Sequence, residues 1–523
     1  MVAFYVLCAA AVYFALLYAV ARKTGGRGDN SAFFRGDRRS PWWAVAFGML
    51  GSSVSGVSLV SVPGMVRAAD MTYMQMCVGF FFGYLVVAFF LLPLYYKLDL
   101  ASIYGYLDIR MGKWAGRTGT SFFLLSKLLG SAVKLYLVCL ILQEYVLRGT
   151  GIPFWATAAV MVFLIWLYTA RGGIRALVWT DVLQTFCLVG ALLLIHFQVV
   201  RLCGLTWTEA ADCVASHPHG RWLEWADWTS RQHFVKQFLS GVFIVIVMTG
   251  LDQDMMQKNL TCKTLRDAQK DMCAYGFMFI PFNALLLSLG VLLLVLSGRM
   301  GIPLPVRGDD ILPMFCAEGY LGTWALLLFA LGIVAAAFNS ADSALTALTT
   351  SFCVDILDVE RRFSRPASVR RRVHGGMALL FVCCILFFEA VDSSSVIDAV
   401  YVVASYTYGP LLGLFAFGLF TRRMPRGRAV PWVCAAAPVC CYLLDGCTTS
   451  AFGYRFGYEL LMLNGLLTFL GLLAVSRRER RQGVRREGKR SQPPLPFRGW
   501  VISVAFRPRK PVPPFRRFSS RRC

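Results

Sequence analysis

The sequence predicts an all-α protein that crosses a membrane many times. Hydrophobic residues make up 57% of the 523 residues and charged residues only 16%, whereas soluble domains carry roughly 25% charge. Mean hydropathy is +0.58, and the apolar residues gather in stretches that suit a bilayer core, which takes about 20 residues to span. This composition excludes a disordered chain, a collagen-like repeat and a small disulfide-stapled domain.

Thirteen apolar segments are long enough to be membrane helices. In chain order they are 2–20, 41–66, 72–95, 119–147, 152–170, 174–200, 234–258, 271–298, 321–357, 374–390, 396–420, 429–446 and 457–475.

The loops between these segments differ sharply in charge. Alternate loops, beginning with 21–40, hold 42 of the 53 Lys and Arg residues, and the opposite loops hold nine. Because basic loops remain in the cytoplasm, we expect an external N-terminus and a cytoplasmic C-terminus in a multi-pass plasma membrane protein, with the bacterial inner membrane as the expected location. The net charge of +24 comes without any nucleic-acid-binding motif, so we expect membrane lipid rather than nucleic acid as a partner.

Two segments carry signals for a helix break inside the membrane. Residues 51–58 contain two Gly and four Ser, and a Met-Thr-Gly-Leu-Asp-Gln-Asp run occupies 248–254. Both compositions disfavour a helix interior, although small-residue helix packing is an alternative for the first. Two broken helices five spans apart predict an inverted repeat of five plus five helices, in which the first helix of each repeat is discontinuous.

This organisation divides the chain into six expected parts. They are a peripheral first helix with a basic inner loop (1–40), the first repeat (41–200), an external loop (201–233), the second repeat (234–420), two peripheral helices (421–476) and a basic disordered cytoplasmic tail (477–523).

Polar residues within the predicted spans are candidates for an ion site. Asp181 and Asp342 are carboxylates at membrane depth, and Asn339, Asp342 and Ser343 share one helix face. Such oxygens suit a hard cation such as Na⁺; the alternative is a hydrogen-bonded seam between helices. Lys127 and Lys134 lie seven residues apart on one face, and the sequence assigns neither a partner.

Five stretches of the sequence resemble the sodium/solute symporter family, whose members have a LeuT-type core. They are SSVSGVSLVSVPG at 52–64, LPLYYKLDLASIYGYLDIRMG at 92–112, GGIRALVWTDVLQ at 172–184, TGLDQDMMQKNLTCKTLRDAQKDM at 249–272 and AAAFNSADSALTALTTSFCVDI at 335–356.

The resemblance implies positions for ions and solute. A main Na⁺ site would use Gly51, Val54, Ala336, Asn339 and Ser340, where Asn339-Ser340 replaces the family's Ser-Ser or Ser-Thr. A second cation site would use Asp181, Asn339, Asp342 and Ser343, and Asp342 takes the place of a hydroxyl or small residue. Candidates for solute binding are Ser53, Ser58, Gln75, Asp252 and Gln253.

The function implied is Na⁺-coupled symport of a small organic solute by alternating access. We expect no enzymatic activity, no cofactor apart from Na⁺ as coupling ion, and no obligate protein partner. One alternative is a proton-coupled symporter that uses Asp342 and Asp181; another is a transporter-like membrane sensor. A sugar, sialic acid, amino acid, monocarboxylate or vitamin would each fit, so the sequence does not name the solute.

Overall fold

The computed structural model describes residues 2–26, 28–147, 150–228, 230–391, 394–452, 456 and 459–478. Helices dominate this part of the chain. The two strands found there, β1 (Arg423–Pro425) and β2 (Ser476–Arg478), form a short antiparallel pair. Residues 477–478 of the predicted disordered tail therefore belong to a strand, and 479–523 lie outside the described residues.

The predicted first repeat begins with the broken pair α3 and α4 and ends with α9. Its helices and helical turns are α3 (Trp42–Ser53), α4 (Gly56–Ala69), α5 (Tyr73–Val86), η2 (Val87–Leu91), α6 (Leu92–Lys97), α7 (Gly105–Met111), α8 (Lys113–Ile141), η3 (Leu142–Val146) and α9 (Phe154–Leu202).

The predicted second repeat begins with the broken pair α11 and α12 and ends with α18. Its members are α11 (Phe234–Val245), η5 (Ile246–Gly250), α12 (Gln253–Asn259), α13 (Leu265–Met300), η6 (Gly308–Asp310), α14 (Ile311–Ala317), α15 (Thr323–Ser351), η7 (Phe352–Leu357), α16 (Val359–Arg362), α17 (Pro366–Val391) and α18 (Ser394–Phe420).

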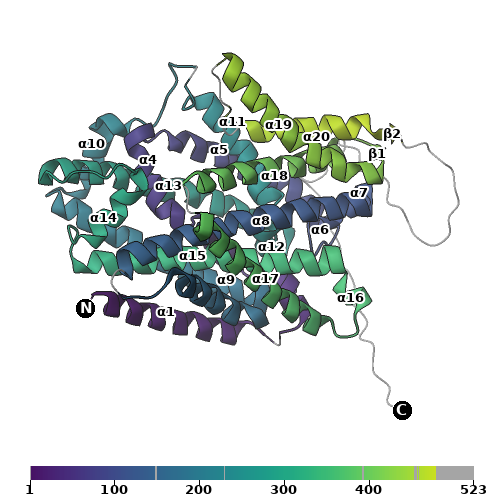
Figure 1. The fold of residues 1–523 in the computed structure, drawn as a ribbon, viewed down its shortest axis with the longest axis horizontal. Coiled ribbons are helices and arrows are strands. Elements are labelled where there is room, and N and C mark those ends of the chain that lie inside the picture. The colour runs from purple at the N-terminus through teal and green to yellow at the C-terminus, as the bar shows by residue number, and fades with distance from the viewer. Residues whose placement is uncertain are drawn as a thin grey trace, which may run out of the picture.

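The remaining helices flank these repeats or cover their ends. They are α1 (Val2–Thr24), α2 (Asn30–Arg35), η1 (Gly36–Arg38), α10 (Trp207–Ser216), η4 (Pro218–Gly220), η8 (Gly427–Ala429), α19 (Val430–Phe452) and α20 (Leu460–Ala474). Figure 1 shows α1 along one edge of the molecule and α19 and α20 along the opposite edge, with the two repeats between them.

The helices of the two repeats intermix in two groups. The bundle consists of both broken helices with α5 and α13, since α5 packs on α11 and α13 packs on α3, α4 and α5. The scaffold consists of α8, α9, α15 and α17, which pack on one another. The broken helices also contact the scaffold, because α3 packs against α9 and α12 packs against α15. The candidate site lies along this boundary.

Helix α9 covers two of the predicted spans. Its backbone leaves helical geometry at Gly173 (φ 50°, ψ −139°), a conformation that glycine adopts readily. A Cβ there would lie 2.5 Å from the Phe33 ring. The predicted boundary between 152–170 and 174–200 is therefore present as a break at Gly173.

By length and composition, the described residues contain eight helices able to cross a membrane, or ten when each bent pair is counted as one span. The remaining predicted segments coincide with the second half of α9 and with two shorter apolar helices, Tyr406–Phe420 and Leu460–Ala474. The chain is thus a multi-pass membrane protein, and the count of thirteen spans stays a prediction.

The inner loop after α1 folds into the protein. Phe33 is fully buried and Phe34 is 4% exposed. The buried Arg370 guanidinium donates hydrogen bonds to the carbonyls of Gly28 and Asp29, both at 2.9 Å, and stacks over the Phe33 ring. This segment therefore covers one end of α9, α12 and α17.

Candidate functional site

The first broken helix is interrupted over two residues. α3 ends at Ser53, Val54 has extended geometry (φ −84°, ψ 92°), and α4 begins at Gly56 after the Ser55 N-cap. The two halves meet at 62°. The predicted break is confirmed, but it is narrower than 51–58 because Gly51 and Ser52 still belong to α3.

The second broken helix is interrupted at Leu251 and Asp252, where α11 and its π-helical extension meet α12 at 71°. The Asp252 carboxylate accepts a hydrogen bond from the Asp254 backbone amide at 2.8 Å and caps the short helix. The break predicted at 248–254 is therefore confirmed.

Carboxylates at the second break bind a lysine of the scaffold. The Lys127 ammonium on α8 lies 3.1 Å from Asp252 Oδ2 and 2.7 Å from Asp254 Oδ2. The Tyr408 hydroxyl of α18 also donates to Asp252, at 2.7 Å. Asp252 and Asp254 are almost fully buried, so the ion pair compensates charges that water does not reach. The structure thus supplies the partner of Lys127 that the sequence did not.

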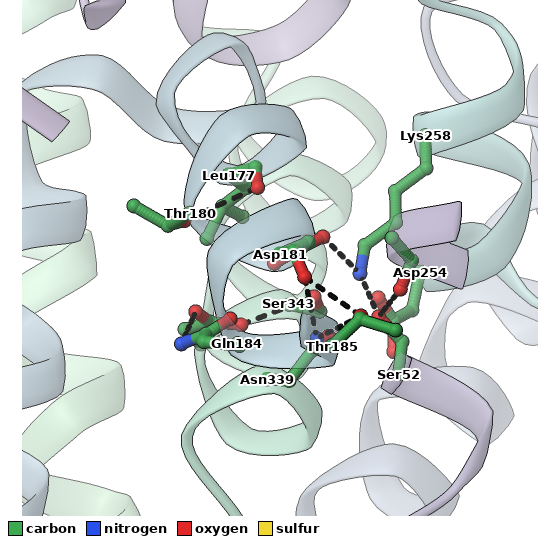
Figure 2. A network of polar contacts seen from close by, with 12 residues as sticks. Ser52, Leu177, Thr180, Asp181, Gln184, Thr185, Asp254, Lys258, Asn339 and Ser343 are labelled. Atoms are coloured by element: carbon green, nitrogen blue, oxygen red, sulfur yellow. Dashed lines mark hydrogen bonds and ion pairs between the residues drawn. The ribbon is translucent and has the colours of Figure 1, made fainter. Parts of the chain in front are cut away.

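A second buried lysine lies at the boundary between bundle and scaffold. The Lys258 ammonium on α12 lies 2.6 Å from Asp181 Oδ2 on α9, and both side chains are 1% exposed. Lys258 also donates a hydrogen bond to Ser52, which donates in turn to Asn339 Oδ1. Figure 2 shows these side chains converging from α3, α9, α12 and α15.

Asn339 links the predicted main site to the predicted second site. Its amide nitrogen lies 3.4 Å from both the Asp181 carbonyl and the Thr185 hydroxyl. A Cβ on Gly51 would stand 2.0 Å from Thr185 Oγ1 and 2.6 Å from Asn339 Nδ2. Only a glycine allows α3 to approach α9 and α15 this closely at that point.

The other members of the predicted main site lie on the same two helices or at the break. Ala336 is buried in α15 one turn before Asn339. Ser340, directly after Asn339, is half-buried. Val54 is the residue at which α3 stops. The structure brings Gly51 and Asn339 into contact, while Na⁺ binding by the whole set remains a prediction.

The Asp342 carboxylate lies within the scaffold. It accepts hydrogen bonds from the Tyr168 hydroxyl, from Gln184 Nε2 at 3.3 Å and from Ser343 Oγ at 3.1 Å. The predicted second set therefore divides. Asp181 pairs with Lys258, and Asn339 is linked to Lys258 through Ser52. The Ser343 hydroxyl instead donates to Asp342. Within the described ranges, no cluster of His, Cys, Asp and Glu could hold a metal ion.

The five predicted solute-binding residues have different surroundings. At the first break, Ser53 bonds the Tyr275 hydroxyl and Ser58 lies 3.2 Å from Ser55 Oγ. Gln75 donates to the Gln232 carbonyl at 2.8 Å, in the external loop. Gln253 accepts from the Ile103 amide at 2.9 Å.

Two of these five, Gln75 and Gln253, thus bind loops, and Asp252 is ion-paired. The structure does not gather the five around one point, and their role in solute binding stays a prediction.

Sequence reasoning missed Lys258. The residue stands at the end of the predicted span 234–258, directly before a loop that contains Lys263, Arg266 and Lys270. A cation in that position looks like part of the basic loop. Asp181, which the sequence left without a partner in the last span of the first repeat, was the signal that a buried cation was required.

Comparison with known proteins agrees with this architecture. A profile of the sodium:solute symporter family matches residues 33–430. The chain belongs to the sodium:solute symporter family, a family of transporters.

Among its relatives, the human sodium/iodide cotransporter is 25% identical over 76% of this chain, which spans 62% of that protein. The sodium/sialic acid symporter SiaT of Proteus mirabilis is 25% identical over 76% of this chain and 81% of its own length.

A solved structure of a Na⁺-coupled sialic acid symporter, in a substrate-bound outward-open state, superposes with a TM-score of 0.75. The two sequences are 20% identical, and the superposition covers 91% of this chain and 99% of the symporter chain. This likeness confirms the fold, and with it the LeuT-type core that the family resemblance implied.

Proposed function

We propose that this protein is a Na⁺-coupled symporter that imports a small organic solute by alternating access. The observation that supports this best is the meeting of the broken α3 with α15, where Gly51 lies against Asn339. Unwound carbonyls and side-chain oxygens at such a junction are typical Na⁺ ligands. The proposed ligands are Gly51, Val54, Ala336, Asn339 and Ser340.

The proposed coupling follows from the position of that site. α3 belongs to the bundle and α15 to the scaffold, so an ion bound to both favours the conformation in which they are adjacent. A ligand shifts an equilibrium only by its differential affinity for the two states. Sodium would therefore stabilise one orientation of the bundle, and the solute would bind beside the breaks.

We further propose that one Na⁺ accompanies each solute. The Lys258 ammonium lies 2.6 Å from Asp181, which is the carboxylate of the predicted second cation site. A Na⁺ bound to the same carboxylate would stand beside the ammonium, and the two cations would repel each other strongly in a buried environment. A second Na⁺ at Asp181 would have to displace the ammonium.

For localisation, we propose the plasma membrane, in particular a bacterial inner membrane, with the N-terminus outside and the C-terminus in the cytoplasm. The support is the excess of Lys and Arg in alternate loops. Membrane lipid is the surrounding partner, and the proposal requires no further protein.

The test is uptake by purified protein in proteoliposomes, with a panel of labelled sugars, amino acids, carboxylates and vitamins and with Na⁺ gradients present or absent. Ser340→Ala should raise the Na⁺ concentration needed for half-maximal uptake. Ser288→Ala on α13 is a matched control, because among the described residues that hydroxyl donates only to the Leu285 carbonyl of its own helix, at 3.0 Å.

Unchanged sodium dependence in Ser340→Ala would remove Ser340 from the site. Uptake driven by a proton gradient without sodium would replace Na⁺ coupling with the proton-coupled alternative. Uptake without either gradient would contradict symport.

A further inference from the structure

Lys134 is a charged residue in the middle of α8 that the network described above does not use. It follows Lys127 by seven residues, which is two helical turns, so both side chains leave the helix on the same face. Lys127 contacts two carboxylates. Lys134 is half-buried, and no hydrogen bond or ion pair among the described residues involves its ammonium.

Contacts on either side of Lys134 place it between the two helix breaks. Toward the start of α8, Lys127 reaches Asp252 at the second break. Toward the end of α8, Val138 packs on Gly56 at the first break, where a Cβ would lie 2.7 Å from Val138 Cγ2. With a rise of 1.5 Å per residue, Lys134 stands about 10 Å from the level of Lys127 and about 6 Å from that of Val138.

The face of α8 that carries Lys134 points into the protein, because Lys127 and Val138 on that face meet the buried Asp252 and Gly56. Gly130 lies one turn before Lys134, and nothing lies within 4 Å of the position of a Cβ there. The same face holds Lys127, whose ammonium meets the buried Asp252. Lys134 therefore looks toward the interior between the breaks rather than toward lipid.

An unpaired ammonium at membrane depth is costly and requires a partner. The carboxylates of the second break are bound by Lys127. The first break offers no acid: it presents the hydroxyls of Ser55 and Ser58 and the start of α4. A helix N-terminus carries partial positive charge, so this side of the space also attracts an anion.

We propose that Lys134 binds the carboxylate of the transported solute, which makes the solute a small organic acid. This proposal rests on the proposed function, because it names the solute class of the same transporter. A charge-assisted hydrogen bond between ammonium and carboxylate is strong where water is scarce. It also gives the two lysines of α8 different roles: Lys127 holds the second broken helix, and Lys134 holds the solute.

The experiment compares matched acids and amides. A library of small carboxylic acids, which includes L-lactate, nicotinate and N-acetylneuraminate, is tested with the corresponding primary amides or methyl esters. Binding is measured by thermal shift of the full-length protein in detergent, and uptake is measured in proteoliposomes. The variants are Lys134→Gln and Lys134→Arg, with Lys113→Gln as control, since Lys113 is an exposed lysine at the start of the same helix.

We expect at least one acid to bind while its uncharged counterpart does not. Lys134→Gln should weaken binding of that acid about tenfold to a hundredfold, in line with the loss of a hydrogen bond between charged groups. Lys134→Arg should retain part of the affinity, and Lys113→Gln should retain all of it. Thermal unfolding without ligand checks that each variant is folded.

Three outcomes overturn the proposal: the uncharged counterparts bind as well as the acids, Lys134→Gln keeps its preference for the acid, or the whole library contains no acid whose binding depends on Lys134.

The Na⁺ dependence of uptake distinguishes a failure of this proposal from a failure of the proposed Na⁺ coupling. Acid uptake that needs Lys134 but not Na⁺ would contradict the proposed Na⁺ coupling and leave the carboxylate site in place. Na⁺-driven uptake of a neutral solute that Lys134→Gln does not affect would contradict the carboxylate site and leave Na⁺ coupling in place.

Discussion

The two broken helices differ in the groups that hold them. The break between α3 and α4 is lined by neutral groups: Ser52, Ser53 and Ser55 form hydrogen bonds there. The break between α11 and α12 is charged, because Asp252 and Asp254 bind Lys127 of α8 and Lys258 binds Asp181 of α9. Related positions in the two repeats have thus received different chemistry.

We infer from this difference that the two breaks have different roles. Two ion pairs tie the second broken helix to the scaffold: Asp252 and Asp254 at the break bind Lys127, and Lys258 near the end of α12 binds Asp181. The first break has no charged residue of its own, although the Lys258 ammonium donates to Ser52 beside it. Its backbone carbonyls are the groups proposed to serve an external cation. A fixed charge at the first break would compete with Na⁺ for the same oxygens.

The largest effect is expected for Lys258→Met, which removes one anchor of the second break. It leaves Asp181 buried without a partner, and loss of one member of a buried pair costs about 3–5 kcal/mol. Thermal unfolding in detergent should show the loss, and added Na⁺ should restore more stability than in the wild type, because the ion takes the place of the ammonium. Lys258→Met with Asp181→Asn should recover most of the stability without Na⁺.

A loss of stability that Na⁺ does not reverse would show that Asp181 cannot receive the ion. In that case the comparison with Lys127, the other lysine that ties the second broken helix to the scaffold, carries the test.

Lys127→Met should be somewhat less harmful than Lys258→Met. The lysine side chain is 14% exposed, against 1% for Lys258, so water screens part of the unpaired charge that remains. The substitution leaves two carboxylates together, and Asp254→Asn in the same chain should relieve part of their repulsion. The measurement is again thermal unfolding, with uptake as a second readout. Equal damage from both lysine variants would contradict the ranking.

The sequence predicted the two breaks and the membrane depth of Asp181, Asp342 and Asn339, because glycine, serine and acids are poor choices for a lipid-facing helix. It did not predict which polar groups satisfy each other. Lys258 was hidden beside a basic loop, and Gln75 and Gln253 looked available for solute although they bind loop backbone.

A polar residue in an apolar span signals that a partner exists. Whether that partner is protein, ion or solute depends on packing between distant segments, which the order of residues does not reveal. The approach of Gly51 to Thr185 is such a contact.

An intermediate effect is expected for Gly51→Ala at the neutral break. The new methyl group would overlap Thr185 and Asn339, and overpacking of this kind costs about 1–3 kcal/mol. Displacement of Asn339 should also raise the Na⁺ concentration needed for half-maximal uptake. Gly376→Ala is the control, because this glycine of α17 is exposed and nothing lies within 4 Å of a Cβ placed there. If Gly51→Ala unfolds and transports as the wild type does, α3 does not approach α15 as described.

The smallest effect is expected for Ser55→Ala, which removes a hydroxyl from the neutral break without disturbing a charge. Ser55 caps α4 by accepting the Ser58 amide at 3.3 Å, and loss of an N-cap costs about 1 kcal/mol. Ser55→Asp restores a cap but places a fixed negative charge at the neutral break. Because Ser55 is 4% exposed, the new carboxylate is buried without a partner and should lower the unfolding temperature in the absence of Na⁺. If the absence of charge there matters for ion binding, Ser55→Asp should also show an altered Na⁺ dependence of uptake, whereas Ser55→Ala should lose stability and keep that dependence. Identical Na⁺ dependence in both variants would mean that the contrast between the two breaks concerns stability alone.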